Sequence, residues 1–395
     1  MPLPILALAL TAFALGTAEF VPNGLLPLIS SDLDISVARA GLVTTTFALG
    51  AMLGGPVVAA ATLKVPRRPL VLVLTAVFLV ANALTSLTHS LAVIGVLRAL
   101  AGAMLGGFLG TAITMSTGLV AAQRRATAIA VVFTGLTASN VVAVPIGNIL
   151  GRAIGWQAAF WVISALAALG LVAMALVVPR ARPGEQEHGD SGLGVLRNGR
   201  LWVSFLAIAL GYGGLFVAFT YIAPFLTDVS GIASGSVTWV LLLFGVGLIG
   251  GNVLGGHLAD RSITAAVLLF LIVLIVGLVA LWALGPVATA VMVLLVVVGA
   301  AGFGMVPPLQ SYVLQVAGTA SAVVSALAAA SFNAGVAVGS GVGGAFLEQV
   351  AAYRLLPLVG AAMTVLGLAI FLLTRRSHAP APTPETPEEA LVSLP

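Results

Sequence analysis

Cysteine is absent from this chain of 395 residues, and charged residues are scarce. The absence of cysteine excludes disulfide bonds, thiol catalysis and cysteine-based metal sites. Asp, Glu, Lys and Arg together make up only 7% of the residues. A soluble domain carries about 25% charged residues, so the composition argues against a soluble fold. The four histidines are scattered, and no nucleophile triad, phosphate loop or metal-ligand cluster is visible, so we expect neither an enzyme nor a bound cofactor.

Apolar residues dominate the chain instead. Hydrophobic residues form 60% of it, and the mean hydropathy is +1.19. The 46 glycines suit membrane helices, in which small residues let backbones approach closely. Twelve apolar segments have about the length needed to cross a bilayer, at 4–28, 39–62, 70–88, 92–118, 126–150, 158–178, 201–225, 237–258, 263–284, 288–314, 321–346 and 353–374. We therefore expect an all-α membrane protein with 12 transmembrane helices in two pseudo-symmetric six-helix bundles.

Two of these segments leave alternatives open. The first could be a cleaved signal peptide, but its opening residues, MPLP, carry no positive charge and the run continues to about Leu28, which favours a spanning helix. The loop VAGTAS between the tenth and eleventh segments has no charge. An unbroken hydrophobic hairpin therefore competes there with two separate helices.

The basic residues predict the orientation of the chain in the membrane. Twelve of them fall on one side of the predicted segments: Lys64, Arg67, Arg68, Arg124, Arg125, Arg180, Arg182, Arg197, Arg200, Arg261, Arg375 and Arg376. Only Arg39, Arg152 and Arg354 fall on the other side, so the positive-inside rule places both termini in the cytoplasm. The pI of about 10.1 has the same origin, and we expect no nucleic acid partner. One Lys against fifteen Arg suggests a GC-rich bacterial genome, and hence a bacterial inner membrane.

The longest polar stretch divides the chain into two halves. Residues 179–200 predict a cytoplasmic linker between an N-terminal six-helix bundle at 1–178 and a C-terminal six-helix bundle at 201–376. Residues 377–395 are Pro-rich and acidic, which is typical of a disordered tail. A shift of 197 residues aligns FALGAMLGG, at 47–55, with FGVGLIGGN, at 244–252, so the halves resemble a duplicated unit. A chance match of Gly-rich apolar helices is the alternative.

One carboxylate falls at mid-membrane depth. Glu19, in the stretch LGTAEFVPNGLLP, is the only acidic residue that we place there. A charge at the centre of a spanning helix costs about 3 kcal/mol, so such residues mark functional sites by default. Burial disfavours the charged form of a carboxylate and a nearby cation favours it, so a group under both influences can exchange a proton. We expect Glu19 to bind protons or substrate; the alternative is a structural ion pair between two helices.

Arg98 is the expected partner of Glu19. By counting residues, Glu19 lies roughly 22 Å from the cytoplasmic end of its helix, and Arg98 roughly 9 Å from the outer end of its own. In a hydrocarbon core about 30 Å thick, both side chains reach nearly the same depth. The alternative is that the long side chain of Arg98 reaches up to the outer surface.

Several motifs, taken in order, resemble the major facilitator superfamily. GHLADR, at 256–261, resembles the family's loop motif, and RALAG, at 98–102, resembles its helix-4 pattern. GLTASNVVAVPIGNILG, at 135–151, resembles its helix-5 antiporter motif, with Ala143 and Val144 where Gly is usual. GTAEF, FTYIAPFLTDVSG, GWQAAFW and SFNAGVAVGSGVGG resemble the twelve-helix drug:proton antiporters, in particular the arabinose-efflux-like and chloramphenicol-type exporters.

The resemblance implies roles for residues of these motifs. In the family, the loop aspartate holds the cytoplasmic ends of the bundles together; only the second half has it here, as Asp260, whereas Leu63 stands at the matching position of the first half. The implied conformational residues are Gly102, Pro145, Gly147, Gly256, Asp260 and Arg261. Glu19 and Arg98 would then lie on helices that share a bundle.

Polar and aromatic residues within the segments are candidates for a substrate cavity. Asn23 lies four residues after Glu19 and so shares its helix face. The expected substrate-binding residues are Asn23, Asn140, Phe216, Phe219, Tyr221, Gln310 and Asn333. Interhelical hydrogen bonding is the alternative role for the Asn residues, and ordinary helix packing is the alternative for the Phe residues.

Together these features predict a proton-coupled secondary transporter that exports a small, largely apolar compound, drug-like or sugar-like, by alternating access. The cavity is expected at the midplane between the halves, and a monomer suffices. The expected partners are the substrate, protons and the lipid bilayer. Uptake by symport or facilitated diffusion is one alternative, although the helix-5 motif argues against it. A non-transporting membrane receptor is another, and a channel is disfavoured because no ring of like charges or filter-like segment is present.

Overall fold

The computed structural model describes residues 2–62, 65–121, 125–179, 197–317 and 322–376, which form helices joined by short turns. The first half contains α1 (Leu3–Asp32), α2 (Val37–Ala40), α3 (Leu42–Ala61), α4 (Arg67–Thr85), α5 (Leu91–Gly118), α6 (Arg125–Ile154) and α7 (Trp156–Val177). The second half contains α8 (Gly199–Phe219), α9 (Ile222–Pro224), η3 (Phe225–Val229), η4 (Ser234–Ser236), α10 (Val237–Arg261), α11 (Ile263–Leu284), α12 (Ala288–Gly304), α13 (Val306–Ala317), α14 (Ala322–Val350), η5 (Tyr353–Leu355) and α15 (Leu356–Arg376). Most of the expected linker and the whole expected tail lie outside the described residues.

The long helices have the dimensions of membrane spans. Within the described ranges, eleven helical segments are long and apolar enough to cross a membrane, and α6 adds a helix of 30 residues whose side chains are only partly described. Each of the twelve predicted segments overlaps one of these helices. The tenth and eleventh are separate, because α13 ends at Ala317 and α14 begins at Ala322. Large apolar side chains such as Leu176 and Trp239 are exposed at 79% and 65%, as expected where lipid replaces water.

Three predicted segments are interrupted along their length. The second begins with the short helix α2, and the seventh continues past the end of α8 through α9 into η3, a π-helix of five residues. The tenth breaks at Met305, between α12 and α13. Pro307 and Pro308 then occupy the first turn of α13, where a missing backbone N–H leaves no hydrogen bond unmade.

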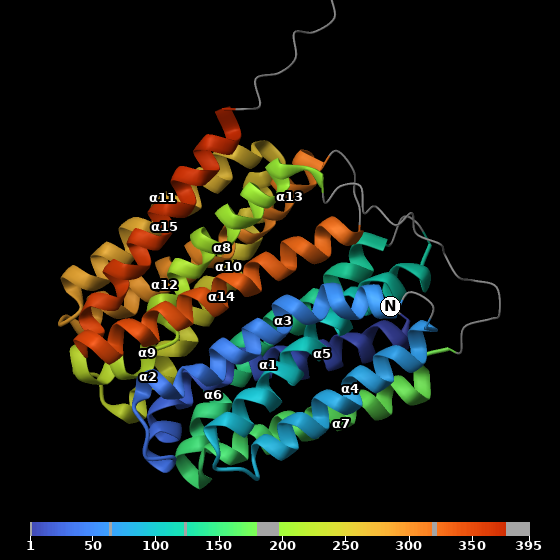
Figure 1. Cartoon of the computed structure of the whole chain (residues 1–395), viewed down its shortest axis with the longest axis horizontal. Coiled ribbons are helices and arrows are strands. Elements are labelled where there is room, and N and C mark those ends of the chain that lie inside the picture. Colours follow the sequence, from blue (N-terminus) through green and yellow to red (C-terminus); the bar gives the residue numbers. More distant parts are fainter. Residues whose placement is uncertain (1, 63–64, 122–124, 180–196, 318–321, 377–395) are drawn as a thin grey trace, which may run out of the picture.

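The two halves of the chain form two groups of helices that lie side by side (Figure 1). In the first group, α1 packs against α6 and α3 packs against α5; in the second, α8 packs against α14 and α15, and α10 packs against α12. Contacts between the groups join α3 and α2 to α14, α1 to α9, and α6 to α10. We call the end of the molecule that carries α2 and α9 the α2 end, and the opposite end the linker end.

The duplication seen in the sequence reappears in the helix packing. A Cβ atom at Gly50 of α3 would overlap the backbone of Ala99 in α5, and one at Gly247 of α10 would overlap the backbone of Val296 in α12. The second pair follows the first by 197 residues at both positions, from Gly50 to Gly247 and from Ala99 to Val296. The pairs Gly54–Ala103 and Gly251–Ala300 repeat the relation one turn further on. The two halves therefore share the same close helix crossing, and the alignment is more than a chance match of Gly-rich sequences.

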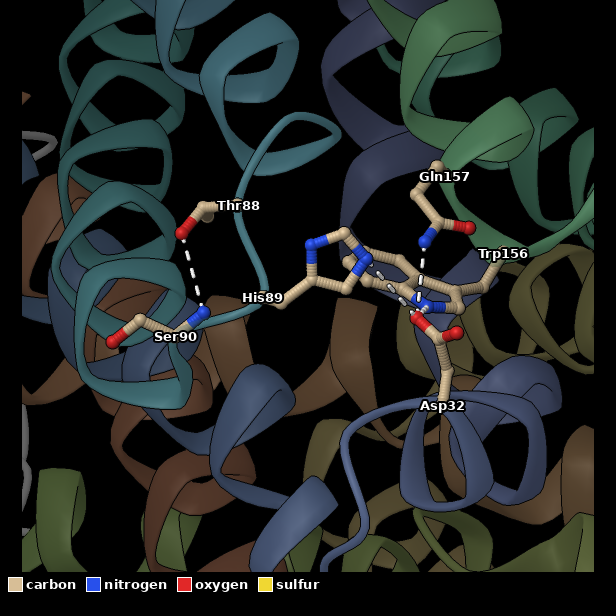
Figure 2. Close-up of polar contacts among 6 residues, drawn as sticks. All are labelled: Asp32, Thr88, His89, Ser90, Trp156 and Gln157. Atoms are coloured by element: carbon tan, nitrogen blue, oxygen red, sulfur yellow. Dashed lines mark hydrogen bonds and ion pairs between the residues drawn. The ribbon is translucent and has the colours of Figure 1, made fainter.

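A polar cluster ties the first group together at the α2 end (Figure 2). Asp32, the last residue of α1, accepts hydrogen bonds from Trp156 Nε1 at 2.8 Å and from Gln157 Nε2 at 3.0 Å, at the start of α7. His89 Nε2, from the loop before α5, lies 3.6 Å from the same carboxylate oxygen. These contacts fix α1, α7 and that loop relative to one another within one group of helices.

The close crossing of α10 and α12 predicts that Gly247→Ala destabilises the protein. The added methyl group would meet the Val296 backbone, and forcing an extra methyl group into such a contact costs about 1–3 kcal/mol. Gly250→Ala on the same helix is the control, because a Cβ atom there meets open space. We expect thermal unfolding of the purified protein to shift to lower temperature for Gly247→Ala only. Equal shifts for both variants would contradict the close crossing.

Candidate functional site

Glu19 lies near the middle of α1 and is partly buried. In the described part of the chain its carboxylate makes no hydrogen bond and no direct ion pair, although the charge of Arg98 acts on it through space. Asn23 follows one helical turn towards the α2 end, as its spacing predicts. The structure therefore brings Glu19 and Arg98 near each other without joining them directly.

Arg98 is held by the backbone of two other helices. Its side chain has no exposed surface. Nη2 donates to the carbonyl oxygen of Ala18 at 2.7 Å, and Nε donates to that of Val43 at 3.1 Å. The guanidinium carbon lies 4.2 Å from the centre of the Phe47 ring, a cation–π contact that offsets part of the cost of burial. Nη1 has no hydrogen-bond partner among the described residues. Arg98 is thus buried between α1, α3 and α5 rather than turned to the membrane surface.

Five aromatic rings, which we call the aromatic cluster, pack beside Glu19 at the contact between the two halves. Its members are Phe20 of α1, Tyr212 and Phe216 of α8, Phe303 of α12 and Phe332 of α14. The centre of the Phe20 ring lies 6.1 Å from those of both Phe216 and Phe303. Tyr212 lies 5.1 Å from Phe216, 5.8 Å from Phe303 and 5.1 Å from Phe332. The residue next to Glu19 therefore touches the second half directly.

Tyr212 belongs to this site, but the sequence did not single it out. Its side chain is 5% exposed, and the Glu19 charge acts on it. No hydrogen bond to its hydroxyl group is found within the described ranges. The available signal was the spacing of Tyr212, Phe216 and Phe219, which puts three aromatic residues on one face of α8.

Two buried asparagines lie between Glu19 and the α2 end. Asn23 is 1% exposed, and its Oδ1 accepts a hydrogen bond from Thr44 Oγ1 at 2.7 Å. No described residue bonds to its Nδ2. Asn148 of α6 has no exposed surface, and neither of its amide atoms has a partner in the part of the chain that the structure describes. A Cβ atom at Gly24 would overlap the Asn148 amide, so Asn148 lies against the residue that follows Asn23. Its position inside the helix-5 motif was the signal that could have identified it.

Tyr221 joins the two halves at the α2 end. Its side chain is 1% exposed, and its hydroxyl group lies 3.0 Å from the carbonyl oxygen of Ser340 in α14 and 3.5 Å from that of Ala38 in α2. A Cβ atom at Gly41, Gly343 or Gly344 would collide with the Tyr221 ring or hydroxyl group. A tyrosine fills this space because all three neighbouring positions are glycines.

The other expected residues lie in several places. Phe219 stacks on Phe244 at 4.1 Å and lines a small apolar pocket formed by α8 to α12, inside the second half. Asn333 bonds to Ala329 of its own helix at 3.1 Å, whereas Gln310 is partly buried without a hydrogen bond in the described chain. The side chains of Asn140 and Pro145 lie outside the described residues.

The structure also gives the surroundings of most of the conformational residues implied by the motifs. Gly102 is in close contact with the Phe47 carbonyl of α3, and Gly147 with Val21 of α1, so both serve helix packing. A Cβ atom at Gly256 would meet open space, and Asp260 and Arg261 are exposed. Neither charged residue forms an ion pair with another described residue.

Comparison with known proteins agrees with this architecture. A family model described as Major Facilitator Superfamily matches residues 8–328. The inner membrane transport protein YdhP of Escherichia coli is 34% identical over 375 residues, which cover 95% of this chain and 96% of that protein. A chloramphenicol resistance protein of Streptomyces lividans is 34% identical over 343 residues, which cover 86% of this chain and 88% of that protein.

The similarity extends to a solved structure. The nucleoside transporter NupG superposes with a TM-score of 0.75 at 14% sequence identity, covering 94% of this chain and 99% of that chain, which bears on the fold alone. The expected fold class and the resemblance to the chloramphenicol-exporter-like branch are confirmed. With its family model, its full-length relatives and its fold in agreement, the chain belongs to the Major Facilitator Superfamily and is a multi-pass membrane transporter rather than an enzyme.

Proposed function

We propose that this transporter exports a small, largely apolar compound in exchange for protons, and that Glu19 exchanges the protons. The observation that carries the proposal is the setting of Glu19, a partly buried carboxylate without a direct partner in the described chain, beside an arginine fixed by backbone carbonyls. Ionisable groups inside a membrane protein usually belong to a transport pathway. The chloramphenicol resistance protein among the relatives supports export as the direction.

The surroundings of Glu19 pull its ionisation in opposite directions. Burial disfavours the carboxylate, and the positive charge of Arg98 favours it. Arg98 cannot move away easily, because its hydrogen bonds go to the backbone of α1 and α3. A change in the hydration of Glu19, caused by substrate or by a movement of the second half, therefore changes its affinity for protons. Exchange follows when proton and substrate favour opposite conformations.

The aromatic cluster supports an apolar substrate. It lies beside Glu19 where the two halves meet, and Phe20 and Phe216 face each other across that contact. Aromatic side chains supply large apolar contact areas. We propose that the substrate binds here between the halves, with Asn23, Asn140, Gln310 and Asn333 as candidate polar contacts. Phe219 and Tyr221 are candidates that flank this region.

Alternating access requires that the two halves close the path on each side in turn. We propose that residues 1–178 and 201–376 move as bundles joined by the linker 179–200, with both termini in the cytoplasm. The α2 end is then the outer side. Contacts of Tyr221 with α2 and α14, and the hydrogen bond at 2.8 Å between Thr45 Oγ1 and Ser340 Oγ, form what we call the outer seal.

A resistance panel tests the substrate class. The gene is expressed in a pump-deficient bacterial host, and inhibitory concentrations are measured for a set of antibiotics that begins with chloramphenicol. A rise for one or more apolar compounds supports export. Unchanged sensitivity to the whole panel, with the protein present in the membrane, contradicts export of a drug-like compound.

Glu19→Gln should abolish uphill, proton-driven export, because glutamine keeps the size and polarity of the side chain but cannot titrate. The variant should still fold and insert. The matched control is Glu348→Gln, which removes an exposed carboxylate near the α2 end. Export by proteoliposomes under an imposed pH gradient is the measurement. Normal pH-driven export by Glu19→Gln would rule out the proton role.

Locking the outer seal should stop transport. The hydroxyl oxygens of Thr45 and Ser340 lie 2.8 Å apart, so cysteines at these positions are close enough to form a disulfide. The chain has no other cysteine, so the pair Thr45→Cys and Ser340→Cys reacts without background. We expect oxidation to abolish export and reduction to restore it. The control pairs Thr46→Cys with Ser340→Cys, because the Thr46 hydroxyl group bonds within its own helix to Leu42. Full export by the oxidised Thr45/Ser340 pair would contradict alternating access at this seal.

A single proton carrier predicts that export of a neutral compound responds to the membrane potential. If Glu19 alone carries protons, each cycle brings in at most one, and export of a neutral compound moves one net charge inward. That charge is worth about 2.3 kcal/mol per 100 mV. An inside-negative potential without a pH gradient should therefore drive export from vesicles. Indifference to the potential would mean that the substrate is a monovalent cation or that the coupling is not one proton through Glu19.

A further inference from the structure

Four polar atoms near α1 in the outer half of the first bundle are buried without a hydrogen-bond partner in the described part of the chain. They are Nη1 of Arg98, Nδ2 of Asn23 and both amide atoms of Asn148. The three side chains are 0%, 1% and 0% exposed. Buried polar groups in folded proteins almost always have a partner, either protein or ordered water. These atoms therefore need a partner that the described side chains do not supply.

The buried groups form one string that starts at Glu19. Arg98 bonds to the carbonyl oxygen of Ala18, the residue before Glu19, and to that of Val43, the residue before Thr44. Thr44 in turn donates to Asn23. The Asn148 amide lies against Gly24, the residue after Asn23. By its position in α6, Asn148 is roughly 9 Å from the end of that helix at Ile154.

The size of the site limits what can occupy it. It lies among α1, α3, α5 and α6, and all four are helices of the first bundle. Gly16, Gly24, Gly147 and Gly151 bring α1 and α6 into close contact around it. This close packing favours a small occupant over a transported compound. Water is small enough, and it can both donate to Asn148 Oδ1 and accept from the amide and guanidinium nitrogens.

We propose that Asn23 and Asn148 hold ordered water inside the first bundle, and that this water carries protons between the outer side and Glu19. The presence of water at this site does not depend on the proposed function. The proton-carrying role of the water does rest on the proposed function. The route runs within one bundle, whereas the substrate path runs between two. Protons can then reach Glu19 while the outer seal is closed to substrate.

The proton transfer is simple to balance. A water molecule next to Glu19 gives a proton to the carboxylate oxygen, and the hydroxide left behind takes a proton from the next water, until the deficit is made up from the outer solution. The charge of Arg98 on α5 acts on Glu19, and the charge of Glu19 acts in turn on Tyr212 of α8. Arg39 on α2 and Arg152 on α6 are exposed at the α2 end. The fixed charge of Arg98 repels an excess proton, so the route delivers one only to an ionised Glu19.

The first test is structural and needs no substrate. High-resolution structures of the full-length protein and of Asn148→Leu are compared, because leucine has a similar size and no polar atom. We expect water density within hydrogen-bond distance of the Asn148 amide in the wild type and its loss in the variant. A dry site in the wild type overturns the proposal, whatever the protein transports.

The second test follows the protonation of Glu19 by infrared spectroscopy after a pH jump, using the carboxylic acid band that Glu19→Gln lacks. We expect protonation to be roughly tenfold slower in Asn148→Leu, in line with the loss of one hydrogen-bonded step, and close to wild type in Asn148→Ser, which keeps a hydroxyl group. Asn82→Leu is the matched control: this asparagine of α4 is also fully buried, bonds to the Phe78 carbonyl at 2.8 Å and has an unpartnered Oδ1.

The outcomes separate the two proposals. Wild-type kinetics in Asn148→Leu, or equal slowing in Asn148→Leu and Asn82→Leu, overturn the water route. A Glu19 band that is present in the wild type, with protonation slowed only in Asn148→Leu, supports the route even if no compound is exported. In that case the proposed export fails, while the proton pathway stands.

Discussion

The burial of Arg98 is the interaction on which the arrangement of the first bundle depends. A guanidinium group with no exposed surface is stable only when its charge is met by hydrogen bonds and polarisable neighbours. Here two backbone carbonyls and the face of Phe47 supply them, and the carbonyls belong to α1 and α3. Arg98 thereby fixes the positions of the backbone next to Glu19 and next to Thr44. Because none of these contacts uses the Glu19 carboxylate, that group remains available for other partners.

The two halves share their packing but differ in their polar residues. The glycine contacts of α3 with α5 recur between α10 and α12 at a constant offset of 197 residues. At the same offset, Glu19 corresponds to Phe216, Arg98 to Leu295 and Gly24 to Tyr221. The charges of Glu19 and Arg98 thus have apolar side chains at the matching positions of the second half. One bundle carries ionisable chemistry, and the other presents an apolar surface to it.

Much of the fold followed from the sequence, because long apolar segments and charged breaks report helix ends directly. The family followed from motifs that are local in sequence, such as GHLADR and RALAG. The depth argument also placed Glu19 and Arg98 near each other, since residue counts along a helix convert to depth. It could not show that Arg98 bonds to backbone carbonyls, because the Ala18 and Val43 carbonyls carry no side-chain signal.

The remaining site residues depend on contacts between distant parts of the chain. Tyr221 was expected in the cavity on the basis of its polarity, whereas its hydroxyl group lies near Ala38 and Ser340, which are 183 and 119 residues away. Nothing in the local sequence reports that neighbourhood. Asn148 and Tyr212 were missed for a related reason. An amide inside a recognised motif and a tyrosine among apolar residues become informative only when burial and missing partners are known.

The space around Tyr221 has a mechanical consequence. Its ring lies between Gly41 on one bundle and Gly343 and Gly344 on the other, with too little room for even a methyl group at any of these positions. A ring confined so closely has no stable intermediate position, because a partly withdrawn ring loses its contacts and its hydrogen bonds to the Ser340 and Ala38 carbonyls together. Under the proposed alternating access, separation of the bundles at this end would therefore break all of these contacts at once, which favours two discrete arrangements.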